Sequence, residues 1–221
     1  MVEIIPAILV KNQEEFLERL KLAAPHVSRI QWDIMDGEFV DNTTFSDPSV
    51  LDDLVSHLPP QTSVPAIEAD LMVSDPRSWV GRLTHPGVDQ LIFHFESSDD
   101  WAPIFGEAKT AGFTIGLAVE PETPFEDYRG LLGQVDRFQA MGGRSGFGGQ
   151  KFNPAVLEKV RGVRQEFPRL PISIDIGVNE KTAPEMVRAG ANILVAGSAV
   201  FKSDNVEKAI KDLKKAAAGR T

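Results

Sequence analysis

The stretch of residues 171–201, PISIDIGVNEKTAPEMVRAGANILVAGSAVF, contains one complete unit of the fold. Its apolar runs Pro171–Asp175 and Asn192–Ala196 are predicted strands, and Lys181–Ala189 between them has the spacing of an amphipathic helix. A glycine-bearing turn follows each predicted strand. A strand, a helix and a strand in this order indicate parallel strands joined by a crossover helix.

The same alternation extends over the rest of the chain, with Gly and Pro at the joins. The other predicted strands are Glu3–Leu9, Arg29–Met35, Val64–Asp70, Val88–His94, Phe113–Val119 and Val135–Met141, and the clearest other helices are Asn12–Ala23, Phe152–Phe167 and Asn205–Ala218. Eight strands alternating with helices in 221 residues predict an α/β fold, a single (β/α)8 TIM barrel with residues 1–221 as one domain. A doubly wound open sheet is the alternative.

The composition excludes several classes of function. A net charge of -9 and a pI near 5.0 argue against a nucleic-acid or anionic-membrane partner, since such partners need basic patches. The absence of cysteine from the sequence excludes disulfides and thiolate metal ligands. No apolar run approaches the ~18 residues of a membrane-spanning helix, and the N-terminus lacks a secretory signal pattern. We therefore expect a cytoplasmic protein.

Three glycine-bearing turns follow the last three predicted strands, at the end of the barrel where active sites lie. The first contains Gly146, Phe147, Gly148 and Gly149, the second Gly177, and the third Gly197 and Ser198. Backbone N–H groups can approach an anion closely where no Cβ intervenes. Any one of these turns could be an ordinary flexible loop, but together they predict a phosphate site, to which Arg144 is a candidate for additional charge.

Two aspartates lie at strand ends on opposite sides of the predicted barrel. Asp33 is near the end of the second strand and Asp175 ends the seventh, so their side chains should face each other across the mouth. Two opposed carboxylates can remove a proton from one face of a carbon and deliver one to the other, which is epimerisation next to a carbonyl. For either aspartate alone, a helix cap or an ion pair is the competing interpretation.

Met35, Met72, Met141 and His94 lie at further strand ends and are candidates for substrate binding. Core packing is the ordinary explanation for the methionines. Their positions also predict an apolar cover over a reactive intermediate, where low polarity strengthens nearby electrostatic interactions. His94 is predicted to face the mouth of the barrel.

Successive blocks of the sequence resemble those of the ribulose-phosphate 3-epimerase family, in order from Pro6 to Phe201. These blocks are PAIL, WDIMDGEFVDNTTF, DLMVSDP, FHFES, GLAVEPETP, GFGGQKFNPAVLEKVR, IDIGV and GANILVAGSAVF. The resemblance implies a barrel of the ribulose-phosphate-binding type that interconverts ribulose 5-phosphate and xylulose 5-phosphate through a metal-stabilised enediolate. It implies that Asp33 and Asp175 are the acid and base, that the ligand is a phosphorylated sugar, and that the protein forms homo-oligomers.

The chain departs from the family at positions that line the expected pocket. Gln31 and Asp70 stand where the family has its two metal-binding histidines. Ala7, Glu120, Arg144-Ser145 and Ile176 replace a serine, an asparagine, an Asn-Pro pair and a glycine. Because the packing and loop motifs persist, we predict altered pocket chemistry on a retained scaffold.

Two alternatives follow for Asp33, Asp70 and Asp175. With Gln31 they could bind a hard divalent cation, and oxygen ligands favour Mg²⁺ or Mn²⁺ over Zn²⁺. If no metal binds, three nearby carboxylates repel one another and the pKa of at least one rises. The predicted function is therefore a sugar-phosphate epimerase or isomerase with an atypical or absent metal site. The alternative is a phosphosugar-binding protein without catalysis. A related decarboxylase or aldolase is disfavoured because DIMD lacks the lysine of their Asp-x-Lys-x-x-Asp motif.

Overall fold

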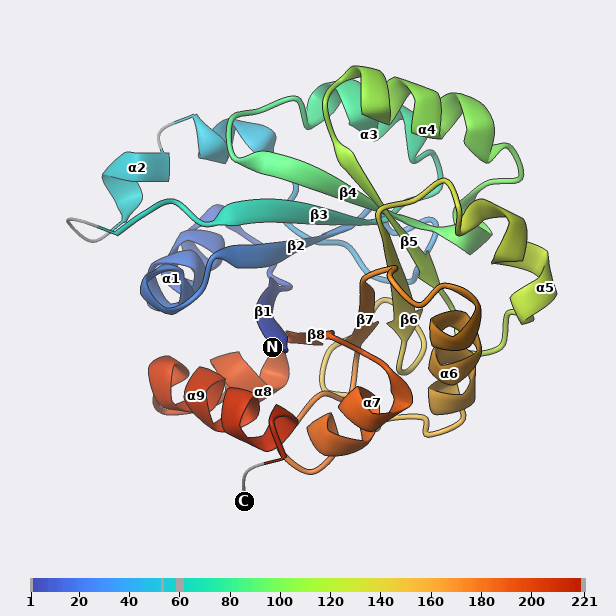
Figure 1. Cartoon of the computed structure of the whole chain (residues 1–221). Helices are drawn as coiled ribbons and strands as arrows, with labels where there is room; N and C mark the ends of the chain where they lie inside the picture. The colour runs from blue at the N-terminus through green and yellow to red at the C-terminus, as the bar shows by residue number, and fades with distance from the viewer. Residues whose placement is uncertain (1, 53, 59–61, 220–221) are drawn as a thin grey trace.

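Eight parallel strands close into a barrel in the computed structural model, which describes residues 2–52, 54–58 and 62–219 (Figure 1). Each strand pairs with the next along the chain, and the last pairs with the first. The strands are β1 Glu3–Ile8, β2 Arg29–Met35, β3 Ala66–Met72, β4 Val88–His94, β5 Thr114–Val119, β6 Arg137–Met141, β7 Ile172–Asp175 and β8 Ile193–Ala196. The predicted TIM barrel is confirmed, and the open sheet is wrong.

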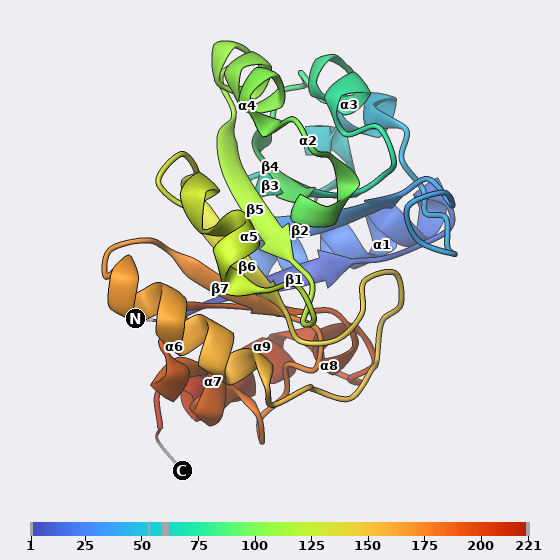
Figure 2. The ribbon, with the colours of Figure 1, turned by 90° about the vertical axis from the view of Figure 1, so that its right-hand side faces the viewer.

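Helices surround the barrel and cover the outer faces of its strands (Figures 1 and 2). They are α1 Gln13–Ala23, α2 Leu54–His57, α3 Arg77–Arg82, α4 Trp101–Thr110, α5 Phe125–Tyr128, α6 Val156–Glu166, α7 Ala183–Ala189, α8 Ser198–Phe201 and α9 Val206–Ala217, with 3-10 turns η1 Ala24–His26, η2 Pro48–Leu51, η3 Phe95–Ser97 and η4 Arg129–Leu131. Asn12 and Asn205 cap α1 and α9, because each side chain accepts a hydrogen bond from the backbone N–H three residues on. No helix of the described ranges is long and apolar enough to cross a membrane.

Most predicted boundaries agree with the structure within two residues, and two differences affect the site or its surroundings. Strand β3 begins at Ala66 and ends at Met72, two residues later than predicted, because pairing starts where the Ala66 N–H donates to the Ser28 carbonyl. Asp70 is therefore inside the strand and Met72 ends it. Helix α6 begins at Val156, four residues later than predicted, since Phe152 packs against the loop after β7.

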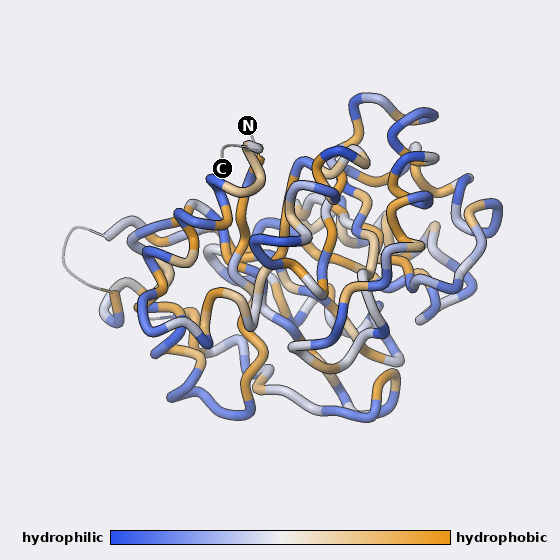
Figure 3. Tube along the Cα trace, turned by 90° about the horizontal axis from the view of Figure 1, so that it is seen from below, coloured by the Kyte–Doolittle hydropathy of each residue, from blue (hydrophilic) through white to orange (hydrophobic). Residues whose placement is uncertain are grey.

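The main apolar core lies between the strands and the helices, where Trp32, Phe93 and Phe138 are fully buried. In Figure 3 hydrophobic segments dominate the middle of the molecule and hydrophilic segments the outer turns. The interior of the barrel holds two small apolar clusters, Ile5, Ala7, Ile193 and Val195 on one side and Ile92, Ala118 and Met141 on the other. Polar side chains fill much of the remaining interior, which is unusual because such groups need partners when buried.

One layer of that polar interior consists of Glu68, Arg137, Gln139 and Ser173, and we name it the paired layer. Arg137 donates two hydrogen bonds to Glu68, at 2.7 and 2.5 Å, with side-chain exposures of 3% and 0%. Arg137 and Ser173 both donate to Gln139 Oε1, at 3.2 and 3.0 Å. Opposite charges in fork-to-fork geometry can offset the cost of burial. The paired layer is therefore a stable polar layer beneath the C-terminal ends of the strands.

Candidate active site

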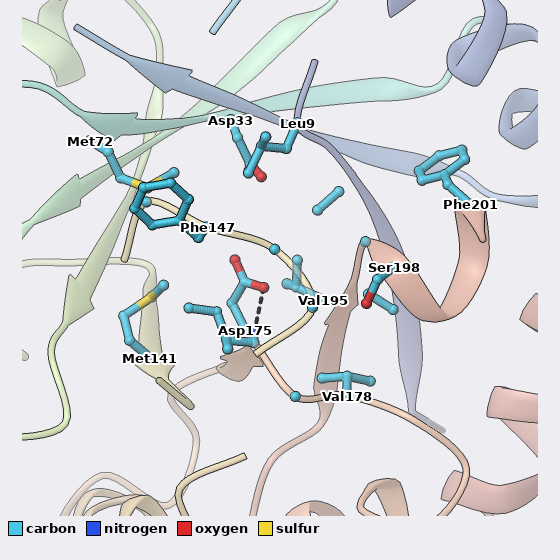
Figure 4. A pocket seen from close by; sticks show the side chains of 18 of the residues that line it. Leu9, Asp33, Met72, Met141, Phe147, Asp175, Val178, Val195, Ser198 and Phe201 are labelled. Atoms are coloured by element: carbon cyan, nitrogen blue, oxygen red, sulfur yellow. Dashed lines mark hydrogen bonds between the residues drawn. The ribbon is translucent and has the colours of Figure 1, made fainter. Parts of the chain in front are cut away.

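A cavity of about 210 Å³ lies at the C-terminal ends of the strands, between β1, β2, β7 and β8 and the loops that follow them (Figure 4). Among the residues predicted to act in catalysis or binding, those lining it are Asp33, Met35, Met72, Met141, Gly146, Phe147, Gly148, Gly149, Asp175, Gly177, Gly197 and Ser198. Asp70 and His94 do not line it. The structure thus brings together in one cavity most of the residues that the sequence distributes over several strands and loops.

Asp33, Asp70 and Asp175 converge from β2, β3 and β7, and we name them the carboxylate cluster. Each offers an oxygen, and these atoms lie within 4.8 Å of one another. The amide nitrogen of Gln31 donates to Asp33 Oδ1 at 2.8 Å, Asp175 Oδ2 at 3.0 Å and Asp70 Oδ2 at 3.3 Å. The amide oxygen of Gln31 is buried and has no hydrogen-bond partner in the described part of the chain. One neutral amide therefore holds three carboxylates together.

Burial and mutual repulsion change the acidity of the two aspartates in the cavity. Burial raises the pKa of Asp175 to about 7, the charge of Asp70 adds to the rise, and hydrogen bonds from Gln31 and the Ile176 N–H oppose it. Burial and the charges of Asp175 and Asp70 also raise the pKa of Asp33 well above its usual range. Near neutral pH one carboxyl can therefore hold a proton while the other is ionised, as an acid–base pair requires.

His94 is fully buried behind the carboxylate cluster. Its Nε2 lies 3.1 Å from Asp70 Oδ1 and its Nδ1 lies 3.4 Å from Ser145 Oγ. Burial lowers the pKa of His94, but the charge and hydrogen bond of Asp70, together with the charges of Glu120 and Glu96, raise it, and the net shift is upward. We predicted that His94 faces the mouth and binds substrate. The structure places it behind Asp70, where Asp70 and Ser145 occupy its two ring nitrogens, and substrate binding by His94 stays a prediction.

The loops after β6, β7 and β8 form the rest of the cavity wall, in part through the backbone of their glycines. The side chain of Asn42 donates to the Gly146 carbonyl at 2.6 Å, and Gln150 donates to the Phe147 carbonyl at 2.7 Å. Gly177 has a φ of 76°, and a Cβ there would lie 2.6 Å from the Cα of Phe152. Only glycine fits so close an approach, so the cavity wall at this position is backbone.

Two basic side chains that the sequence analysis missed also line the cavity. Lys202 Nζ lies 3.6 Å from the position of a Cβ on Gly149, and the described residues offer it no hydrogen-bond or ion-pair partner. Arg19 is occupied, since it donates to the Leu9 carbonyl at 3.0 Å. Lys202 follows Ser198 by four residues at the end of α8, so helical spacing could have placed them together. Arg144 lines a different cavity, beside Glu96 and Glu120.

Comparison with known proteins shows the family of this chain. The profile of the Ribulose-phosphate 3 epimerase family matches residues 3–201. The chain belongs to the ribulose-phosphate 3-epimerase family. Several curated members are similar along most of their length. The ribulose-phosphate 3-epimerase of Mycobacterium bovis is 34% identical over 221 residues, covering 97% of this chain and 92% of the relative. The cytoplasmic isoform of the enzyme from Oryza sativa subsp. japonica is 35% identical over 194 residues, covering 86% and 82%.

Solved structures with much lower identity share the barrel. KGPDC from Streptococcus mutans aligns with a TM-score of 0.75 at 14% identity, covering 99% of this chain and 98% of that one. A 3-hexulose-6-phosphate synthase aligns with a TM-score of 0.68 at 18% identity, covering 98% and 99%. At these identities the likeness shows the fold alone.

Proposed function

We propose that this member of the ribulose-phosphate 3-epimerase family inverts the configuration at C3 of ribulose 5-phosphate. The observation that carries the proposal is the meeting of Asp33 and Asp175, from opposite sides of the barrel, in a cavity with glycine loops at its other end. The names of the similar curated proteins support the same reaction.

The glycine loops and Lys202 hold the phosphate of the substrate. Backbone N–H groups of the loops containing Gly146, Gly149, Gly177 and Gly197 supply the donors, since no side chains separate them from the cavity. Lys202 adds a positive charge that no neighbouring acid of the described ranges neutralises. Binding at this end fixes the distance of the reacting carbon from the wall formed by β2 and β7.

The two aspartates then transfer protons on opposite faces of C3. One carboxylate removes the proton from C3, and the electron pair left behind forms the enediolate, with negative charge on the oxygen of the C2 carbonyl. The other carboxyl delivers its proton to the opposite face, which inverts the centre. The pKa of Asp175 and that of Asp33 are both raised, which favours a protonated carboxyl that can act as the proton donor.

Met35, Met72 and Met141 exclude water from the reacting carbon. All three line the cavity, and each is at most 3% exposed. In Figure 4 Met72 is drawn next to Phe147, and Met141 is drawn on the side of Asp175. A thioether surface donates no proton, so an enediolate beside it is protected from unwanted protonation.

The carboxylate cluster fits a hard divalent cation such as Mg²⁺ or Mn²⁺. Asp33, Asp70 and Asp175 are oxygen donors, and the unpartnered oxygen of Gln31 becomes a fourth if the amide turns by half a rotation. Thiolate and imidazole ligands, which favour zinc, are absent from the cluster among the residues described. A cation held there would supply positive charge beside the enediolate oxygen.

The test is turnover of ribulose 5-phosphate, followed by NMR for the appearance of xylulose 5-phosphate. The protein is first stripped with a chelator and then supplied with Mg²⁺, Mn²⁺ or Zn²⁺ in separate samples. We expect conversion, and we expect Asp33→Asn to abolish it. Failure to convert the substrate with any of these cations, in protein shown to be folded, would contradict the proposal.

A further inference from the structure

A chain of hydrogen bonds runs from the carboxylate cluster to a second cavity beside the active site, and we name it the His94 chain. His94, at the end of β4, lies with its Nε2 3.1 Å from Asp70 Oδ1 and with its Nδ1 3.4 Å from Ser145 Oγ. The Ser145 N–H, in the loop after β6, donates to Glu120 Oε1 at 3.1 Å. Glu120 directly follows β5. Four neighbouring strands of the barrel, β3 to β6, or the loops after them, thus contribute one residue each.

The inner part of the His94 chain is shielded from solvent. Asp70 and His94 are 0% exposed and Ser145 is 5% exposed. The ring of Phe39 covers the imidazole of His94, with the two ring centroids 5.5 Å apart. His94 does not line the active-site cavity. Its two ring nitrogens therefore contact Asp70 and Ser145 in the closed interior of the protein.

The outer end of the His94 chain is anchored at Glu120. Its carboxylate lines a cavity of about 550 Å³, with Glu96 and Glu122 among the other lining residues. The Glu120 N–H donates to Glu96 Oε1 at 2.9 Å, and the Glu120 carbonyl accepts from Lys159 Nζ. An acceptor fixed in this way holds the Ser145 backbone, and the Ser145 hydroxyl is held with it.

The inner end of the His94 chain fixes one oxygen of Asp70. His94 holds Oδ1, whereas Oδ2 accepts from Gln31 and Gln139, each at 3.3 Å. A carboxylate is planar, so fixing Oδ1 also sets the direction of Oδ2. Outer hydrogen-bond partners of this kind orient the groups that bind a metal, and their loss typically reduces metal affinity by roughly 10–100-fold.

Three residues of the His94 chain are positions at which the sequence departs from the family, namely Asp70, Glu120 and Ser145. A proline in place of Ser145 would have neither a hydroxyl for His94 nor an N–H for Glu120. A buried carboxylate at position 70 needs a donor, which His94 supplies. The three departures are thus connected by direct contacts through one histidine.

We propose that His94, Ser145 and Glu120 are positioning residues, which hold the Asp70 carboxylate in the carboxylate cluster and so set the affinity of the cluster for a divalent cation. Each acts through Asp70 and none through the substrate. This inference rests on the cation site of the proposed function, and it does not depend on the epimerisation step.

The experiment measures binding of Mn²⁺ without substrate, by calorimetry and by the electron paramagnetic resonance signal of the free ion. Wild type is compared with His94→Asn, Ser145→Ala and Glu120→Ala. We expect the Kd for Mn²⁺ to rise by roughly 10–100-fold in His94→Asn, and to rise less in the two outer variants. Glu122→Ala is the matched control, because it removes the same charge from the same cavity as Glu120→Ala. It should leave the Kd unchanged.

His94→Gln separates positioning from a general loss of structure. A glutamine can place its amide nitrogen near the position of His94 Nε2 and donate to Asp70, whereas an asparagine is too short. His94→Gln should therefore recover most of the affinity that His94→Asn loses. If His94→Asn does not fold, Ser145→Ala and Glu120→Ala still test the chain from its outer end.

A Kd equal to that of wild type in folded His94→Asn or Ser145→Ala would overturn the proposal, as would a wild type that binds no Mn²⁺. Equal losses in Glu120→Ala and Glu122→Ala would also overturn it, since charge in the second cavity would then explain both. A raised KM in His94→Asn with unchanged Mn²⁺ affinity would instead assign His94 to substrate binding.

Turnover of ribulose 5-phosphate, followed by NMR in the same variants, separates this inference from the proposed function. Weaker Mn²⁺ binding in the variants of a protein that does not convert the substrate would support the positioning role and contradict the reaction. Conversion with Mn²⁺ affinity unchanged in every folded variant would support the reaction and overturn the positioning role.

Discussion

Two buried layers of charged side chains lie one above the other inside the same barrel, and they differ in how their charges are matched. In the paired layer, Arg137 and Glu68 carry opposite charges and meet in two hydrogen bonds. In the carboxylate cluster, three acidic side chains share one neutral amide and have no cationic partner among themselves. A buried pair of opposite charges can be accommodated in a folded protein. Buried charges of one sign lower its stability and shift pKa values, as catalytic sites often require.

Gln139 connects the two layers. Its oxygen accepts from Arg137 at 3.2 Å and its nitrogen donates to Asp70 at 3.3 Å. The two layers are therefore expected to have different roles although their residues are in contact. Substitutions in the lower layer should change stability, and substitutions in the upper layer should change activity.

The largest expected effect is on catalysis, from Asp33→Asn or Asp175→Asn. Each removes one member of the acid–base pair, and general acid–base catalysis typically contributes about 10²–10⁴-fold to the rate. Turnover should fall by that factor, while the free energy of unfolding stays constant or rises because one like charge is removed. Asp89→Asn, in a partly exposed pair with Arg29, is the control. If a folded Asp175→Asn variant kept normal turnover, the carboxylate cluster would not supply the acid and base of the reaction.

Breaking the paired layer should give the largest loss of stability. Arg137→Met leaves the buried Glu68 with only a longer ion pair to Arg29 Nε at 3.7 Å, and loss of one partner of a buried pair typically costs about 3–5 kcal/mol. Chemical denaturation measures it. The double variant Arg137→Met/Glu68→Leu should recover most of the loss, because no charge remains unpaired. If the double variant were as unstable as the single one, packing rather than charge would explain the paired layer.

Lys202→Gln should weaken substrate binding with little effect on the chemical step. A hydrogen bond to a charged group is typically worth about 1.5–3 kcal/mol, so KM should rise by roughly tenfold or more while kcat changes little. Lys211→Gln, an exposed lysine paired with Glu207 on α9, should change neither. Inorganic phosphate as a competitive inhibitor gives a second readout. A KM equal to that of wild type would exclude Lys202 from the phosphate site.

A further expected effect is a pH dependence of stability in protein stripped of metal. The native pKa of Asp175 is about 7, against 3.8 for an ordinary aspartate, so between these values the native state binds more protons than the unfolded state. Stability should therefore fall as pH rises from about 4 to 7. Thermal unfolding across this window, with Asp175→Asn as the variant that flattens the slope, measures the effect. If Asp175→Asn left the slope unchanged, the pH dependence of stability would come from groups other than Asp175.

The sequence predicts those features of the fold and of the site that depend on local residue patterns. Alternation of apolar residues placed β2 and β4 with their observed bounds, and barrel geometry brought Asp33 and Asp175 to one mouth. Contacts between elements distant in sequence were not predictable. His94 is behind Asp70 because Ser145, from another loop, binds its second ring nitrogen.

The strain at Ile176 depends on a distance that no local pattern contains, whereas the spacing of four residues from Ser198 could have indicated Lys202. Lys202 reaches the cavity because α8 directs it toward Gly149, and Ile176 has a strained φ of 71° because β6 approaches β7 at Gly142. The identity of Gln31 signalled an altered site, but its donation to three carboxylates at once required the closed barrel.

The most direct test of the account is exchange of the C3 proton of ribulose 5-phosphate for deuterium, followed by NMR in D₂O. Wild type, Asp33→Asn and Arg137→Met are compared after chelation and again with Mg²⁺ or Mn²⁺. We expect C3 proton exchange in wild type that depends on the added cation. Arg137→Met should show the same exchange per folded molecule, and Asp33→Asn should show none. Undiminished exchange in Asp33→Asn, or no exchange in folded wild type with either cation, would contradict the assignment of the chemistry to the carboxylate cluster.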